Sequence, residues 1–257
     1  MNYILYKKLI SHSFQEMMIY RQTAFIAIVI GLVFYSIEIF AGYVYFDYAD
    51  AIFGWTKNEY LMLINTANLI TYIYQIFFVS SHENLTELIL EGELDYVFVR
   101  PLNSQIFYSL YRLDVPSIIN FIVVLCFQFF LSIEQNLSID KIILYCFAIS
   151  LAVIFTYVLN QIVVTISFWK DNLTGLIGIP ESLIEFSSRP ESIYPSSIRI
   201  ILTKIIPILL AINLPVKILR GEKVLVSLLW LISVDIFGLY VTKVMWKQGC
   251  KKYISAN

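Results

Sequence analysis

The fold class is decided by the stretch from Thr23 to Phe46, which reads TAFIAIVIGLVFYSIEIFAGYVYF and contains one charged residue, Glu38. A helix needs about 20 apolar residues to cross the hydrocarbon core of a bilayer. This stretch is long enough to do so, and it is too long and begins too late for the core of a signal peptide. We therefore expect a transmembrane helix at residues 23–46 that stays in the mature protein.

The composition extends this conclusion to the whole chain. Of the 257 residues, 59% are hydrophobic and 14% are charged, whereas an ordinary soluble domain has roughly 25% charged residues. This composition excludes a water-soluble globular protein. The net charge of -1 shows no excess of the basic residues that a nucleic-acid partner requires, and the odd number of cysteines implies no disulfide framework.

Further apolar stretches predict an all-α membrane protein with six transmembrane helices, forming one domain over residues 1–257. The predicted spans are residues 23–46, 60–80, 115–133, 142–168, 172–188 and 224–245. Residues 1–21 alternate apolar and polar side chains at helical spacing, which predicts an amphipathic helix lying in the membrane interface.

The region from Asn172 to Arg220 has two interpretations, because glycines and prolines interrupt every candidate helix there. In the first, residues 172–188 form a short fifth span and residues 189–223 form an outer re-entrant or interfacial hairpin. In the second, Ile198 to Leu219 is the span. Non-helical backbone at membrane depth must be buried in protein or face a water-filled cavity, so both interpretations place this region beside a pathway. We adopt the first.

The distribution of Lys and Arg near the span ends predicts the orientation. With the amino terminus in the cytoplasm, the first two outer loops carry only Lys57 and Lys141 as basic residues. We therefore expect a multi-pass protein of the cytoplasmic membrane, in contact with lipid, with both termini in the cytoplasm. The outer segment from Arg189 to Lys223 weakens this bias, since it holds up to six basic residues.

The cytoplasmic connection between the second and third predicted spans, residues 81–114, is the most informative polar segment. Residues 82–91 predict a short amphipathic helix with Ser80 or Ser81 as N-cap and Gly92 as its stop. The segment that follows ends at Arg100-Pro101, where the proline favours an extended Arg100. Such a region offers a rigid, charged projection to a cytoplasmic partner. The alternative is an interfacial loop helix with solvated carboxylates.

The stretch LEGELDYVFVRPL at residues 90–102 resembles the G-x-L/I-D-x-x-L-x-R-P-L signature of small six-span permeases of type-2 ATP-binding-cassette (ABC) exporters. The matching positions are Gly92, Leu94, Asp95, Arg100, Pro101 and Leu102. A second similarity lies in the spaced residues Phe168-Trp169, Phe186, Pro190, Ile193-Tyr194-Pro195, Arg199, Ile206-Pro207, Pro215 and Gly221. The resemblance covers the chain from about Ser80 to Gly221.

The resemblance implies a permease that pairs with a second permease, identical or homologous, and with two copies of a nucleotide-binding ATPase. It also implies a coupling helix that docks on the ATPase. Here that role falls on Glu83, Glu87, Glu91, Gly92, Asp95, Arg100 and Pro101. The chain has no G-x-x-x-x-G-K-[ST] motif to hold ATP phosphates, so we expect it to bind no cofactor itself, with ATP and magnesium on the partner.

Four polar residues of the second predicted span, Asn65, Asn68, Tyr72 and Gln75, recur at three- and four-residue steps and fall on one side of a helix. One interpretation is a stripe that faces a substrate or a second permease. The other is ordinary interhelical hydrogen bonding, worth about 0.6 kcal/mol for each bond.

Isolated carboxylates also lie within the predicted spans. Glu38 and Asp235 are far from the span ends, and each has either a proton-coupled role or a structural partner. Glu181 and Glu185, followed by Arg189 at the next four-residue step, either support a helix through opposite charges or line an outer vestibule.

Nothing in the sequence predicts catalysis. His12 and His82 lie in separate segments without metal-binding spacing, so we predict neither a catalytic residue nor a metal site. The sequence favours one half of an export permease for an amphipathic or hydrophobic cargo such as a peptide, lipid or antibiotic. The alternatives are a non-transporting scaffold or sensor that recruits a cytoplasmic partner, and a proton-coupled transporter that uses Glu38, Glu181 and Asp235.

Overall fold

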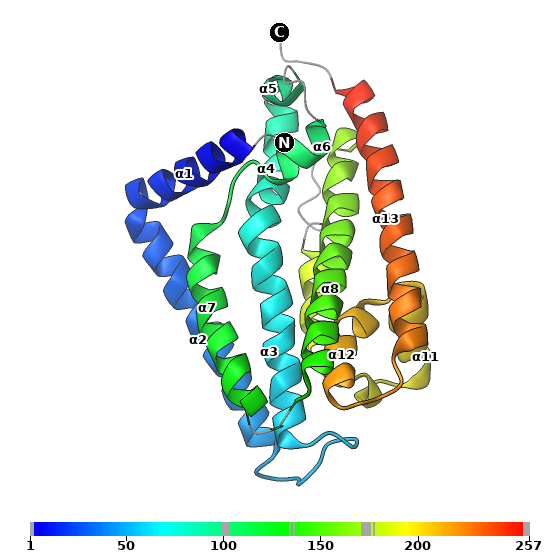
Figure 1. The fold of residues 1–257 in the computed structure, drawn as a ribbon. Helices are drawn as coiled ribbons and strands as arrows, with labels where there is room; N and C mark the ends of the chain where they lie inside the picture. The colour runs from blue at the N-terminus through cyan, green and yellow to red at the C-terminus, as the bar shows by residue number, and fades with distance from the viewer. Residues whose placement is uncertain are drawn as a thin grey trace.

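The computed structural model describes residues 3–98, 103–133, 135, 137–170, 176 and 178–253, and within them the chain is helical, without strands (Figure 1). The α-helices are α1 (Tyr3–Ile19), α2 (Arg21–Tyr45), α3 (Lys57–Tyr74), α4 (Ser80–Leu90), α5 (Asp95–Phe98), α6 (Ser104–Ser109), α7 (Val115–Ile133), α8 (Ile139–Thr165), α10 (Ile179–Ser187), α11 (Ser196–Ile200), α12 (Ile208–Leu219) and α13 (Leu225–Lys252). Short π or 3-10 turns are η1 (Gln75–Val79), η2 (Ile166–Phe168), η3 (Glu191–Ile193) and η4 (Ile201–Ile205).

Five helical stretches are long and apolar enough to cross a membrane, which confirms the predicted all-α membrane fold. They are Arg21–Tyr45, Lys57–Leu90, Val115–Ile133, Ile139–Phe168 and Leu225–Lys252. All of them run along the bundle axis (Figure 1). We call the end with α1, α4–α6 and the last turns of α13 the α4 end, and the end with residues 46–56 the loop end.

The second spanning helix corrects one prediction. We expected a break with Ser80 or Ser81 as the N-cap of a separate helix, but the chain stays helical from Lys57 to Leu90. Val79, before α4, has helical dihedral angles and no side-chain cap bond. No proline or glycine interrupts this stretch, so nothing stops the helix, and a serine cap is not needed.

The described residues on either side of α11 and α12 show at which end of the bundle this segment lies. Ser192 Oγ donates to the Phe53 carbonyl (3.4 Å) and the Arg220 guanidinium donates to the Gly54 carbonyl (3.1 Å), so residues 192 and 220 both lie at the loop end. Phe168 lies at the α4 end, against Trp246 of α13. Phe168 is therefore at the α4 end, whereas Ser192 and Arg220, on either side of α11 and α12, are both at the loop end.

The observed helices differ in their bounds from both interpretations of this region. The helix in the predicted fifth span, residues 172–188, is α10, which covers Ile179–Ser187 and is too short to cross alone. Residues 171–175 and 177 lie outside the described residues. Residues 198–219 of the second interpretation do not form one straight helix, because the helices on either side of Ile206-Pro207 meet at 88°. A proline disfavours helical dihedrals in the residue before it.

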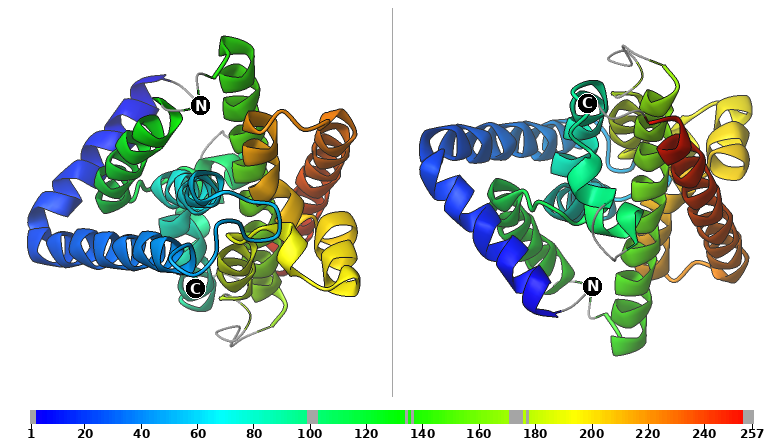
Figure 2. Two further views of the ribbon diagram at one scale, coloured as in Figure 1. Left: turned by 90° about the horizontal axis from the view of Figure 1, so that it is seen from below. Right: turned by 90° about the horizontal axis from the view of Figure 1, so that it is seen from above.

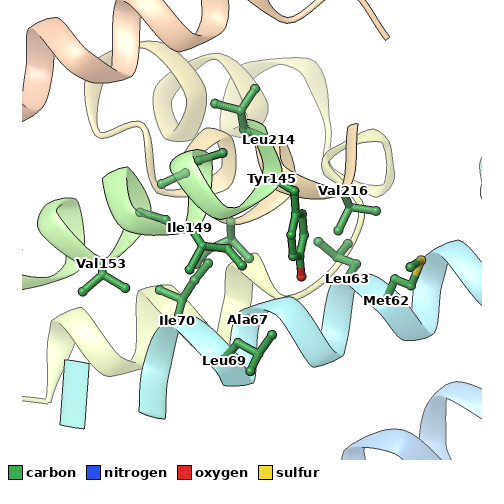
Figure 3. Close-up of a cluster of buried hydrophobic side chains, with 14 of the residues drawn as sticks. Met62, Leu63, Ala67, Leu69, Ile70, Tyr145, Ile149, Val153, Leu214 and Val216 are labelled. Atoms are coloured by element: carbon green, nitrogen blue, oxygen red, sulfur yellow. The ribbon is translucent and has the colours of Figure 1, made fainter. Parts of the chain in front are cut away.

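Helix α3 lies between two groups of helices (Figure 2). On one side are α2 and α7, and on the other are α8 and α12, with α13 packed against α8. We call these the α7 group (α1, α2 and α7) and the α8 group (α8, α12 and α13). An apolar cluster joins α3 to the α8 group through side chains such as Ile70, Ile149 and Leu214 (Figure 3).

Helices α8 and α13 approach closely because Gly238 has no side chain. A Cβ atom at Gly238 would lie 2.5 Å from Val158 Cγ1, well inside normal contact. Small residues allow this kind of backbone approach in membrane helices, where apolar surfaces alone give little driving force for association.

Helix α1 lies across the α4 end, at a steep angle to α2 (Figure 1). Glu16 pairs with Arg112 (2.7 Å), and Ser13 Oγ accepts a hydrogen bond from the Leu113 backbone N–H (3.0 Å). These contacts attach the predicted interfacial helix to the loop before α7.

Candidate coupling surface and buried polar groups

Helix α4 has an acidic, exposed face. Glu83, Glu87 and Glu91 are exposed at successive four-residue steps, and Glu93 is exposed just beyond the helix. Residues four apart lie on one side of a helix, so these carboxylates form a negative surface at the α4 end. We call Glu83, Glu87, Glu91 and Glu93 the acidic surface.

The opposite face of α4 is fixed by a second apolar cluster, separate from the core around α3. Leu85 and Leu94 are fully buried in this cluster. Its other buried members are Val97, Phe107, Tyr108, Val164, Phe168 and Trp246. Because these residues come from α5, α6, α8, η2 and α13, the acidic surface is carried on a packed support and not on a free loop.

Two hydrogen bonds add to this support. Thr86 Oγ1 lies 2.8 Å from Ser167 Oγ at the end of α8, and the Tyr253 hydroxyl accepts from the Leu94 backbone N–H at 3.0 Å. Burial raises the pKa of the Tyr253 hydroxyl, so it stays neutral at physiological pH. Helix α4 is thus joined to η2, which directly follows α8, and the segment after α4 is joined to the residue that follows α13.

Gly92 ends α4, as the sequence predicted. Its φ of 72° lies in the left-handed region, where glycine is favoured. Its N–H bonds to the Ile89 carbonyl (3.4 Å), and the Glu93 N–H bonds to the Leu88 carbonyl (3.0 Å). This is a Schellman motif, which satisfies the last carbonyls of the helix. Arg100 and Pro101, the other end of the predicted coupling region, lie outside the described residues.

His82 is a functional candidate that the sequence did not predict. It is 2% exposed and lies between Tyr74 and Gln161. The Gln161 Oε1 atom, 3.1 Å from His82 Nε2, can only accept a hydrogen bond, so Nε2 donates. His82 Nδ1 then accepts from the Tyr74 hydroxyl at 2.8 Å. Neutral histidine therefore satisfies both contacts and links α3, α4 and α8.

Close to His82, Tyr108 of α6 holds the first turn of α4. Its hydroxyl donates to the Ser81 carbonyl at 2.7 Å, and burial raises the pKa of this hydroxyl.

The sequence did contain a signal for the burial of His82. His82, Leu85 and Ile89 share the apolar side of one helix, and this position favours a buried histidine over a solvated one.

The π segment η1 lies where α3 passes into α4. Its wider turn leaves the Ile76 carbonyl free to accept a hydrogen bond from the Asp114 N–H (3.1 Å), just before α7. Gln75, the last member of the predicted polar stripe, accepts from Ser117 Oγ of α7 (3.2 Å). A π turn of this kind often marks a functional site in a helix.

Asn65 is the centre of a buried network between α3 and the α7 group. Its Oδ1 accepts from the Tyr35 hydroxyl of α2 (2.6 Å). Its Nδ2 group donates to Gln128 Oε1 (2.6 Å) and to the Val124 carbonyl (3.1 Å), both on α7. These contacts lie within one chain.

The rest of the predicted stripe also contacts the α7 group. Asn68 donates to Glu38 Oε2 (2.6 Å), and the Tyr72 hydroxyl donates to the Gly31 carbonyl (3.3 Å). The four residues of the predicted stripe, Asn65, Asn68, Tyr72 and Gln75, thus each form a hydrogen bond to α2 or α7 inside the chain.

The two isolated carboxylates differ. Glu38 has Asn68 as its partner. Asp235 on α13 is 3% exposed, and neither of its carboxylate oxygens has a hydrogen-bond partner among the described residues. Glu181 and Glu185 are exposed on α10, and neither forms an ion pair with Arg189 in the described part of the chain.

No group of three or more metal-ligating side chains is found among the described residues. Together, the crossing helices and the acidic surface at one end define a multi-pass α-helical membrane protein with a polar end suited to a water-soluble partner.

The family model described as ABC-2 family transporter protein matches residues 32–257, and the chain belongs to this family. It is an ABC-2 type permease, which confirms the resemblance read from the motifs. Membership implies pairing with an ATPase subunit. The comparisons with curated proteins and with solved structures give no match.

Proposed function

We propose that this permease is the membrane subunit of an ATP-driven exporter and that α4 is the helix on which its ATPase docks. The observation that carries the proposal is the position of Glu83, Glu87 and Glu91 on an exposed face of a helix that continues the second span without a break. A row of carboxylates favours a basic groove on the partner through electrostatic complementarity.

The contacts of α4 would transmit a movement of the docked ATPase to the membrane-spanning helices. A displacement of the acidic surface moves α3 directly, because the helix is continuous through η1. It also moves α8 through His82–Gln161 and Thr86–Ser167. Coupling of this kind requires packed, bonded elements between the two sites, and the second apolar cluster provides them.

The partners and orientation follow from this role. Two ATPase copies, each binding ATP and magnesium, would serve two permeases, identical or homologous. Because cytoplasmic ATP powers the ATPases, the α4 end faces the cytoplasm. Both termini then lie on that side of the cytoplasmic membrane, as the Lys and Arg distribution predicts. Arg100 and Pro101 stay predicted members of the docking region.

An apolar groove between α7 and α8 supports a hydrophobic or amphipathic cargo. It has a volume of about 860 Å³ and is lined by residues such as Leu125, Phe129 and Ile142. Its walls come from the α7 group on one side and the α8 group on the other. A peptide, lipid or antibiotic with an apolar part fits this chemistry.

Charge reversal tests the docking proposal. We expect Glu87→Lys/Glu91→Lys to insert normally but to lose ATPase co-purification and cargo-dependent ATP hydrolysis, since both side chains are exposed and their reversal opposes a basic groove. Asp47→Lys/Asp50→Lys, which reverses two exposed acids at the loop end, is the matched control and should keep the ATPase.

Two outcomes contradict the proposal. One is normal ATPase binding and hydrolysis by the α4 variant. The other is a wild-type protein that co-purifies with a cytoplasmic partner lacking ATPase activity, which is the result expected for a scaffold or sensor.

A further inference from the structure

A cavity of about 670 Å³ lies at the loop end between the re-entrant segment and the start of α13. Its walls include Arg199 of α11, Lys204 of η4, Lys217 of α12 and Trp230 of α13. In Figure 1, α11 lies beside the first turns of α13. The docking surface of α4 is at the other end of the bundle, so this cavity is a separate site.

The cavity has an excess of positive charge. Glu191 also lines it, but this carboxylate is paired with Lys217. Arg199 is half-buried, and neither it nor Lys204 forms an ion pair with any residue that the structure describes. Two cations without a carboxylate partner therefore face the same cavity. Unpaired charge close to a membrane is unfavourable unless it meets water or an anion.

The remaining walls are both polar and apolar. Thr203 and Ser227 contribute hydroxyl groups beside the cations, while Leu210, Val226 and Trp230 contribute apolar surface. Trp230 is 43% exposed, and tryptophan is enriched at the level of lipid headgroups. A molecule that matches this lining has an anionic group at one end and an apolar tail at the other.

The bend before α12 creates this arrangement. Residues 196–205, which carry Arg199 and Lys204, lie at 88° to α12, which carries Lys217. All three cations therefore line the same cavity. Asn213 fixes the base of the turn, because its Oδ1 accepts from the Glu191 N–H (3.0 Å) and its Nδ2 donates to the Ser187 carbonyl (3.2 Å). The cations are thus held on a supported turn.

We propose that this cavity binds the phosphate headgroup of an anionic lipid, with Arg199 and Lys204 on the phosphate and the lipid tail along Val226 and Trp230. Arginine and lysine both form charge-assisted hydrogen bonds to phosphate. The site depends only on the membrane fold and not on ATPase docking, so it is tested on the permease alone.

The test measures lipid binding to the purified full-length chain in a neutral detergent by native mass spectrometry. Phosphatidylglycerol is compared with phosphatidylcholine of the same acyl chains. We expect the wild-type protein to prefer phosphatidylglycerol, and Arg199→Gln/Lys204→Gln to weaken that binding about tenfold while leaving phosphatidylcholine unchanged, as loss of charge-assisted bonds predicts. Arg199→Lys should retain most of the binding.

The control removes two exposed charges at the other end of α13, Lys247→Gln/Lys251→Gln. If the control and the cavity variant lose phosphatidylglycerol binding equally, the lipid is attracted to positive charge in general, and the proposed site is overturned. Glycerol phosphate, which has the anionic group but no tail, is the second arm. Binding of glycerol phosphate as tight as that of the lipid would assign the cavity to a free phosphate and overturn the lipid proposal.

Discussion

The two sides of α3 share one apolar cluster, which includes Tyr35 of α2 and Val124 of α7, but they differ in their polar contacts. Toward the α7 group, Asn65, Asn68, Tyr72 and Gln75 each bond to a side chain or carbonyl of α2 or α7. Toward the α8 group, the contact is an apolar cluster of closely fitted side chains (Figure 3), with one hydroxyl pair between Thr66 and Tyr145.

This difference shows how one helix can fix two neighbours within a membrane. Lipid tails are as apolar as leucine, so apolar helix surfaces associate through close packing and not through the hydrophobic effect. Close fit matters inside the α8 group, where Gly238 of α13 meets Val158 of α8, whereas hydrogen bonds help to fix the register of α3 against the α7 group. Substitutions that add volume should therefore weaken packing inside the α8 group most. Substitutions that remove polar partners should weaken the contact of α3 with the α7 group.

The largest effect is expected for Gly238→Val. A Cβ at Gly238 would lie 2.5 Å from Val158 Cγ1, closer than real Cβ contacts come, so either Val158 or α13 must shift. Overpacking of this kind costs about 1–3 kcal/mol, and we expect the upper part of that range. The free energy of unfolding in sodium dodecyl sulfate titrations measures it. Gly54→Val is the control at the loop end. Its φ is positive and a Cβ there meets no atom within 4 Å, so this variant measures the cost of backbone strain without overpacking.

A somewhat smaller loss is expected for Asn65→Leu. This change removes three bonds, to Tyr35, Gln128 and the Val124 carbonyl, at about 0.6 kcal/mol each, or roughly 2 kcal/mol together. The double mutant cycle Asn65→Leu with Tyr35→Phe should show coupling, because the Tyr35 hydroxyl donates to Asn65. Additive losses in the cycle would contradict the role given to this network.

The same comparison explains which features the sequence could predict. Spans 23–46, 115–133 and 224–245 are long and mostly apolar, with few charged residues, so hydropathy alone locates them. The polar residues of α3 fall on one helical face, so their common direction was also predictable. Their partners were not, because Tyr35, Val124 and Gln128 come from other helices and no local pattern records a tertiary contact.

The features that were missed depend on backbone geometry or on distant residues. Ser80 and Ser81 are good N-cap residues, yet the same types are tolerated inside a helix that nothing interrupts. The π turns η1 and η4 shift the register by a residue, which the helical period of the sequence does not reveal. Proline occurs at several positions in this region, and the sequence alone did not show that the sharp bend lies at Ile206-Pro207.

The smallest effect, with the opposite sign, is expected for Asp235→Leu. Asp235 is buried on α13 and has no hydrogen-bond partner among the described residues, and replacing such a group with an apolar one is often neutral or stabilising. We expect a gain of about 1 kcal/mol in the free energy of unfolding. The matched change in the α7 group is Glu38→Leu, which removes the partner of Asn68 and should not stabilise.

The pair of carboxylate variants also tests the proton-coupled alternative. If transport uses ATP alone, Asp235→Leu should keep ATP-dependent export when the proton gradient is dissipated, and its rate should match that of the wild type. Loss of export by a variant that is more stable would mean that Asp235 acts in transport, because proteins accept the cost of a buried, unpaired acid mainly at functional sites. A destabilised Asp235→Leu would instead show that the carboxylate has a structural partner.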